Sequence, residues 1–189
     1  MAYKNLIAQS CNNPIETFLR CRDFLCSRVG TYDYSTTGIG WTLHDMYYLL
    51  GGSSHYYDTT SQDTISINDY FVVKSVGEDG LRQLYFKFTY VSGAINVDGY
   101  LYWDNSSHTG YKRYYSSSAS WTNTLATNNI LWVYGDLDKV QLISKYSTTH
   151  YPCEIGWCPD SSLSTAVTAH AGSISAGSSV AVTFTSVPA

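Results

Sequence analysis

Charged side chains are scarce in this 189-residue chain: Asp, Glu, Lys and Arg make up only 14% of it, against roughly 25% in an average soluble domain. The 11 basic and 15 acidic residues give a net charge of −4, so no positive field would attract nucleic acid or anionic lipid. No apolar run reaches the ~18 residues of a membrane-spanning helix. Gln9, Ser10, Asn12 and Asn13 interrupt the first apolar residues, and we therefore expect neither a cleaved secretory signal nor a membrane partner.

The motifs of common catalytic sites are also missing. The sequence contains no glycine-rich phosphate loop, no Gly-x-Ser-x-Gly elbow and no HExxH pattern. Asp136 and Asp138 flank a turn residue, an arrangement that fits turn chemistry better than calcium binding or glycoside hydrolysis. The histidines are scattered and form no pair at metal-ligand spacing: His44, His55, His108, His150 and His170. We therefore expect no enzyme, no cofactor and no metal site.

Cysteine is present in an odd number, so at least one thiol has no partner within the chain. The five are Cys11, Cys21, Cys26, Cys153 and Cys158. Their spacings lack the tighter intervals and nearby histidines of structural zinc sites. In a reducing compartment we expect free thiols that behave as small apolar residues. The alternative is that the thiols are oxidised after release from a cell and that a leftover thiol forms a disulfide bridge between subunits.

Aromatic and hydroxyl side chains dominate what is there. The chain has 18 Tyr and 44 Ser plus Thr, with 44% hydrophobic residues. Such a chain buries enough apolar surface to offset its ordering entropy, which excludes intrinsic disorder. Its length favours a single core. The composition suits β-sheets and extended protein contacts better than helix bundles.

One segment has the pattern of a helix. Asn13 is a suitable cap, Pro14 fits the first helical position and Glu16 is placed for a capping box. Gly30 is positioned to close the helix in a left-handed conformation. The apolar residues that recur at helical spacing are Ile15, Phe18, Leu19, Leu25 and Cys26. This single stripe predicts a helix that covers a sheet or, alternatively, docks on another subunit.

From Ile39 onward, short apolar runs between turn residues predict antiparallel strands. A two-residue turn at Ser92-Gly93 would place apolar residues opposite each other on one face and opposite charges on the other. The opposed pairs would be Val91/Ala94, Tyr90/Ile95, Phe88/Val97, Leu84/Leu101, Lys87/Asp98, Thr89/Asn96 and Tyr85/Tyr100. A slip of one residue would disrupt both faces. A second turn at Asp79-Gly80 would add a third strand, with Phe71 opposite Phe88 and Val73 opposite Phe86.

Further segments follow from the same signals. Residues 130–134 and 139–146 predict a strand pair across a turn, whereas 51–63 and 104–129 have the composition of polar loops. No Lys or Arg occurs from Thr31 to Val73, although five Asp do, which predicts a negative surface. After Pro159, small residues predict two light strands that lie on the main sheet or on a neighbouring subunit.

The sequence thus predicts a mainly β fold, an antiparallel β-sandwich or meander sheet with one N-terminal α-helix and a light C-terminal strand arm. We expect an N-terminal helical segment over 1–30, a β core domain over 31–160 and the arm over 161–189.

Several aromatic residues lie in polar sequence, where a core does not require them. Tyr and Trp give large, rigid contact area at low entropic cost, which makes these residues candidates for an interaction surface. They are Tyr56, Tyr57, Tyr111, Tyr114, Tyr115 and Trp121. We expect 111–121 and the arm to be covered by other chains. Stacking on sugar rings is the alternative role for such side chains.

Four blocks of the chain resemble segments of the virion structural proteins of tailed bacteriophages. They are TYDY at 31–34 with GIGWTLHD at 38–45, DYFVV at 69–73 with GEDG at 77–80, GYLYWDN at 99–105, and YGDLD at 134–138. The resemblance spans about Ile15 to Trp157 and carries no catalytic signature. It implies a structural component of the neck, tail, baseplate or fibre region, assembled in the host cytoplasm and located in the virion. Its implied partners are other virion proteins and copies of itself. The alternative is a receptor- or carbohydrate-binding β module of a tail fibre, with a host-surface receptor as partner.

Overall fold

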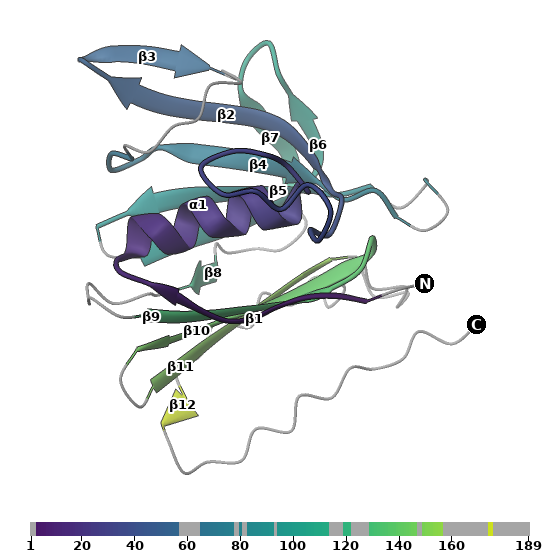
Figure 1. Ribbon diagram of the computed structural model, residues 1–189. Coiled ribbons are helices and arrows are strands. Elements are labelled where there is room, and N and C mark those ends of the chain that lie inside the picture. The colour runs from purple at the N-terminus through teal and green to yellow at the C-terminus, as the bar shows by residue number, and fades with distance from the viewer. Residues whose placement is uncertain are drawn as a thin grey trace.

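The structure is a computed structural model of the whole chain. It describes residues 3–56, 65–77, 80, 83–92, 94–113, 119–121, 129–146, 149–156 and 174–175. The described chain is mainly β, with two antiparallel sheets and a short helix between them (Figure 1). Within these ranges, no helix has both the length and the apolar character that crossing a membrane requires.

The larger sheet has the strand order β3-β2-β4-β5-β6-β7, with β8 added beside β6. Its strands are β2 (Thr42–Leu50), β3 (Ser53–Tyr56), β4 (Tyr70–Lys74), β5 (Tyr85–Val91), β6 (Ala94–Asp104), β7 (Thr109–Arg113) and β8 (Ala119–Trp121). The predicted meander is confirmed: Phe88 lies opposite both Val97 and Phe71, and Lys87 opposite Asp98. One predicted pair, Leu84 with Leu101, is wrong. Strand β5 begins one residue after Leu84, and Leu101 is 38% exposed whereas Leu84 is buried.

The smaller sheet has the order β1-β9-β10-β11-β12. Its strands are β1 (Lys4–Cys11), β9 (Asn129–Gly135), β10 (Lys139–Tyr146), β11 (Thr149–Gly156) and β12 (Ile174–Ser175). The predicted pairing of β9 with β10 is confirmed. The turn between them is held by the Asp136 carboxylate, which accepts hydrogen bonds from the N–H groups of Asp138 and Lys139, both at 2.9 Å. Strand β1 was not predicted, because it pairs with β9, 118 to 131 residues away, and lacks clear alternation.

The helix α1 (Pro14–Leu25) starts as predicted. The Asn13 side chain accepts a hydrogen bond from the Glu16 N–H at 2.9 Å. The Glu16 carboxylate reaches back one residue further than in a standard capping box, to the backbone N–H and the side chain of Asn12. The cap thus satisfies the Glu16 N–H, one of the helix donors that lack an intrahelical partner, and Glu16 in turn satisfies the N–H of Asn12 before the cap.

The end of α1 differs from the prediction. The helix stops at Leu25, and Ser27, not Gly30, takes the left-handed conformation with φ 46°. The chain then folds back over the helix end, so that the N–H groups of Ile39 and Trp41 bond to the carbonyls of Phe24 and Leu25. Gly38 is needed at this crossing, because a Cβ there would lie 2.4 Å from the Phe24 carbonyl oxygen. The carbonyl groups at the end of α1 are thus satisfied by the backbone that returns at 39–41, not by a glycine cap.

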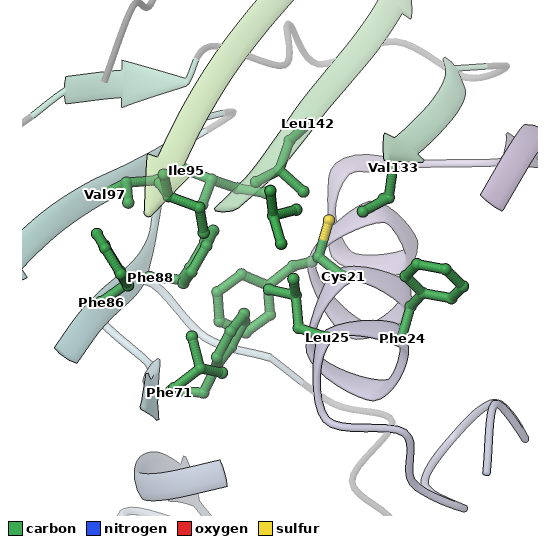
Figure 2. Packing of buried hydrophobic residues seen from close by; sticks show 14 of the residues in the cluster. Cys21, Phe24, Leu25, Phe71, Phe86, Phe88, Ile95, Val97, Val133 and Leu142 are labelled. Atoms are coloured by element: carbon green, nitrogen blue, oxygen red, sulfur yellow. The ribbon is translucent and has the colours of Figure 1, made fainter. Parts of the chain in front are cut away.

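Helix α1 lies between the two sheets, and its Cys21, Phe24 and Leu25 belong to one core cluster with residues of both sheets (Figure 2). The prediction of a single apolar stripe is therefore too narrow. Arg22 and Asp23 are also buried, at 1% and 0% exposure. Their side chains form an ion pair of 2.8 Å, as buried charges require. The two sheets thus enclose most of α1, and its partly exposed residues are Ile15, Glu16 and Arg20.

Both segments predicted as long loops contain strands. Strand β3 lies within 51–63, and β7 and β8 lie within 104–129. Strand β3 lies at the edge of the sheet, and its residues are exposed or only partly buried. The predicted negative surface over 31–73 is also weakened, because Asp45 and Asp69 are each only 1% exposed. The light strands predicted after Pro159 lie outside the described residues, and the short strand β12 that is described there pairs with β11.

Three free thiols, Cys11, Cys21 and Cys153, lie buried in the core around α1. Burial raises the pKa of Cys11 to about 11 and that of Cys153 to about 12, and it raises the pKa of Cys21 well above the ordinary value. The thiolate is the reactive form. We therefore expect these three positions to resist a thiol reagent such as DTNB at pH 8 until the protein is unfolded in urea. Peptide mass spectrometry identifies the labelled positions, and fast labelling of any of the three in the folded protein would contradict this burial.

The stability of the helix start depends on pH through the Glu16 carboxyl group. Partial burial acts to raise the pKa of Glu16, but hydrogen bonds from the Asn12 N–H and from Arg20 outweigh it and lower that pKa. A carboxyl group whose pKa is lower in the folded state stabilises the fold above its unfolded pKa, about 4.3, and loses this effect as pH falls through the folded value. We expect Glu16→Gln to reduce the free energy of unfolding by about 1 kcal/mol at pH 7. The difference from the native protein should shrink at pH 3, as urea titrations would measure, and an equal difference at both pH values would contradict the assignment.

Candidate interaction site on the larger sheet

The two faces of the larger sheet carry different side chains. Phe71 and Phe88 point to the core with α1, so the alternating residues Tyr70 and Val72 point to the opposite, outer face. A second aromatic cluster forms there. Its members are Tyr70, Val72 and Trp103, with Tyr47, Tyr85 and Tyr100 packed against them.

The β6–β7 hairpin folds back over this outer face. In the sheet, β4 and β5 separate β6 from β2, yet the Trp103 Nε1–H donates to Asp45 Oδ2 of β2 at 2.8 Å. The side chain of Asn105, at the hairpin tip, also donates to the His44 carbonyl at 3.1 Å. Such contacts between non-neighbouring strands require the sheet to coil, as the ribbon shows for β6 and β7 beside β2 (Figure 1).

Asp45 is the centre of this arrangement. Its carboxylate is buried and accepts three hydrogen bonds: from the Met46 N–H at 2.8 Å, from Trp103 Nε1 at 2.8 Å and from His108 Nδ1 at 2.9 Å. Because a carboxylate only accepts, the proton of this last bond lies on Nδ1. Nε2 is then the remaining polar atom of the His108 ring, and it has no hydrogen-bond partner among the described residues.

His108 has a strained backbone. Its φ of 52° lies in the left-handed region, which is unfavourable by roughly 1–2 kcal/mol for residues other than Gly, Asn and Asp. The turn before it is fixed by Asp104, whose carboxylate accepts from the Ser106 N–H at 2.8 Å and the Ser107 hydroxyl at 3.0 Å. These hydrogen bonds lower the pKa of Asp104. The bond to Asp45 and the stacking described next hold His108 where the local conformation alone would not favour it.

Tyr56 lies against the His108 ring. The two ring centroids are 3.8 Å apart and the planes differ by 15°. Tyr47, the partner of Tyr56 in the β2–β3 register, lies 5.3 Å away, and its hydroxyl contacts the Ser54 hydroxyl at 3.3 Å. Tyr56 nevertheless remains 47% exposed. At this end of the outer face, the Tyr56 ring is therefore stacked on His108 and still about half exposed.

Lys87 supplies the positive charge of the outer cluster. Its Nζ lies 4.1 Å from the centroid of the Tyr70 ring and 5.8 Å from that of Trp103, within the range of cation–π attraction. Burial lowers the pKa of Lys87, and the carboxylates of Asp98 and Asp45 oppose this shift. The rings and the lysine thus form a compact layer in which the charge is covered by aromatic faces.

The six predicted interaction residues have different placements. Tyr56 belongs to the stack on His108. Tyr111 lies on β7, equally exposed at 47%, with its ring 6.0 Å from that of Tyr102. The backbone of Trp121 pairs with Ile95 through β8. Tyr57, Tyr114 and Tyr115 lie outside the described residues.

The residues that sequence reasoning missed are Asp45, Trp103 and His108. The bonds that join them span 58 and 63 residues, and no local pattern shows that such distant side chains meet. The pairing of β2 with β4 has a register shift between Leu43 and Asp45. Among the described residues, no group of His, Cys, Asp and Glu is arranged to hold a metal ion.

Comparisons of the chain with protein-family models, with curated proteins and with solved structures returned no match.

Proposed function

We propose that this chain is a structural component of a tailed-bacteriophage virion and acts through contacts between subunits in the neck, tail, baseplate or fibre region. The resemblance of four sequence blocks to such proteins supports the proposal. The observation that carries it is the pair of exposed aromatic rings on the β6–β7 hairpin, Tyr102 at 55% and Tyr111 at 47% exposure. Exposed tyrosines at the margin of a sheet are typical of surfaces that another protein covers.

The edge strand β1 offers a second contact region. Tyr3 just before it and Ile7 within it are 65% and 58% exposed. A bulge between Leu6 and Gln9, with Ala8 at φ 48°, interrupts the edge. Bulges of this kind limit unspecific strand pairing. Contacts here would therefore depend on a partner of matching shape, either another virion protein or a copy of this chain.

The test uses particles of the virus that encodes the chain. Antibodies raised against the purified protein should label the neck, tail, baseplate or fibre region by immunogold electron microscopy, and the protein should stay with purified particles in constant ratio to the capsid protein. A chain that is abundant in infected cells but missing from purified particles would contradict the proposal.

A double variant, Tyr102→Ser with Tyr111→Ser, separates assembly from folding. Because both rings are exposed, we expect the free energy of unfolding to change by no more than about 0.5 kcal/mol. Incorporation into particles should fall strongly. Normal incorporation of this variant would show that the hairpin is not the contact surface.

The alternative role, a receptor- or carbohydrate-binding module of a tail fibre, is favoured by one specific observation. This is the exposed Tyr56 ring supported by His108.

A further inference from the structure

We infer that Tyr56 and His108 form a binding site for the ring of a neutral saccharide on the outer face of the larger sheet. This inference gives a ligand class to the alternative role and does not depend on the assembly role. The His108 ring covers one side of Tyr56 at 3.8 Å. The Tyr47 ring also lies 5.3 Å from that of Tyr56, and Tyr56 is still 47% exposed, so part of the ring remains open to a ligand.

The site is held in place before any ligand arrives. Tyr56 is fixed by the β2–β3 register and by its stacking on His108. His108 is fixed in turn by the buried Asp45 carboxylate, 2.9 Å from Nδ1. A ring that is already ordered loses little conformational freedom on binding, which favours affinity for a small ligand. Asp45 is therefore a positioning residue for the stack.

The chemistry around Tyr56 fits a sugar. An aromatic face carries negative charge density and attracts the weakly positive C–H groups on the flat side of a pyranose ring. Hydroxyl groups around such a ring need donors and acceptors at the rim, and His108 Nε2, the Ser54 hydroxyl and the Tyr47 hydroxyl belong to the same cluster.

Charge at the rim favours a neutral ligand. Asp104, in the turn that carries His108, has a lowered pKa and is ionised at pH 7. Lys87 is enclosed by the rings of Tyr70 and Trp103 and faces the carboxylates of Asp98 and Asp45. A phosphorylated or acidic sugar would have the Asp104 carboxylate in the turn before His108 as a neighbour along the chain, whereas Lys87 is partly buried beside the rings of Tyr70 and Trp103. Neutral hexose and N-acetylhexosamine rings avoid this repulsion.

A merely structural contact accounts less well for the geometry. The hairpin is attached to β2 by the bonds from Trp103 and Asn105 as well as by His108. An Asn at position 108 would adopt the left-handed conformation with less strain. The fold instead keeps a strained histidine whose ring supports a half-exposed tyrosine, and strain of this kind is concentrated at binding sites.

The experiment measures binding of the full chain to immobilised neutral oligosaccharides of two to six hexose or N-acetylhexosamine units, with sialylated and phosphorylated sugars as the charged comparison. We expect saturable binding to at least one neutral member. Tyr56→Ala should weaken it by about tenfold or more, and Tyr56→Phe, which keeps the ring, by no more than about twofold.

Tyr111→Ala is the matched control, since Tyr111 has the same exposed fraction on a different strand. It should leave binding unchanged, whereas His108→Asn should weaken binding while the thermal unfolding midpoint stays close to that of the native protein. The inference is overturned if the native chain binds none of the neutral sugars, if charged sugars bind more tightly, or if Tyr111→Ala weakens binding as much as Tyr56→Ala. If the chain binds glycans but is missing from virus particles, the binding site is supported and the assembly role is contradicted.

Discussion

Replacing Arg22 with methionine is expected to lower the free energy of unfolding by about 3–5 kcal/mol. Arg22 and Asp23 are 1% and 0% exposed, in the layer between the two sheets. The Arg22 Nε donates to Asp23 Oδ1 at 2.8 Å, and Asp23 Oδ2 also accepts the Tyr32 N–H at 3.0 Å. Methionine matches the length of the aliphatic part of arginine but leaves the Asp23 carboxylate buried without its closest cation, which is the source of the large effect.

Two comparison variants separate charge from packing. In Arg22→Met with Asp23→Asn, the neutral amide still accepts the Tyr32 N–H, so we expect it to recover about 1–2 kcal/mol relative to Arg22→Met alone. Arg20→Met removes a partly exposed ion pair with Glu16 and should cost about 1 kcal/mol. Urea titrations at pH 7 measure all three. The assignment fails if Arg22→Met costs no more than Arg20→Met, or if adding Asp23→Asn lowers stability further.

The β5–β6 hairpin shows what local sequence determines. Its two-residue turn and the alternation on both sides fix one register, and every predicted pair from Val91/Ala94 to Tyr85/Tyr100 is confirmed. The information is local, because a shift by one residue would place Phe88 and Lys87 on the wrong faces. The prediction fails one step further, at Leu84 and Leu101, where the strand begins to coil and the alternation that it relied on ends.

The helix shows what local sequence cannot determine. Its start depends on neighbours within four residues and was predicted correctly, whereas its end depends on the chain that returns at 38–41. Charged residues normally face water, and the apolar stripe predicted from the sequence does not include Arg22 and Asp23. Their side of the helix is closed by a second sheet whose first strand, β1, precedes the helix and pairs with β9. Only the tertiary fold shows this enclosure.

In the candidate site, too, local sequence predicts some features and the tertiary fold determines the others. Tyr56 was identified as an interaction residue because it lies in polar sequence, and it is indeed half exposed on an outer strand. The carboxylate that supports it through His108 was not identified, since Asp45 lies on another strand and 63 residues away from that histidine. Residues 104–129 were predicted as a polar loop, so neither the β6–β7 hairpin nor the contact of its tip with β2 was predicted.

Replacing Asp45 with alanine is the second change for which we expect a large effect, a loss of about 3 kcal/mol in the free energy of unfolding. The substitution leaves the N–H groups of Met46, Trp103 and His108 without their acceptor. Buried donors without partners cost about 1–3 kcal/mol each, and water that enters at the His108 side would compensate part of this. The hairpin would also lose its main attachment to β2, so Trp103 should become hydrated and its fluorescence emission should shift to the red.

His108→Asn is the control, because it removes the histidine donor and keeps the Asp45 carboxylate as acceptor. Asp45 would keep the bonds from Met46 and Trp103, and asparagine tolerates the left-handed backbone of this position. We therefore expect a loss of no more than about 1 kcal/mol and little change in Trp103 emission. An Asp45→Ala variant as stable as the native protein, or a His108→Asn variant that loses as much as Asp45→Ala, would contradict the central role of the carboxylate. If both expectations hold, His108 contributes little to holding the hairpin, and the strain of its backbone is explained by the ring that it places under Tyr56.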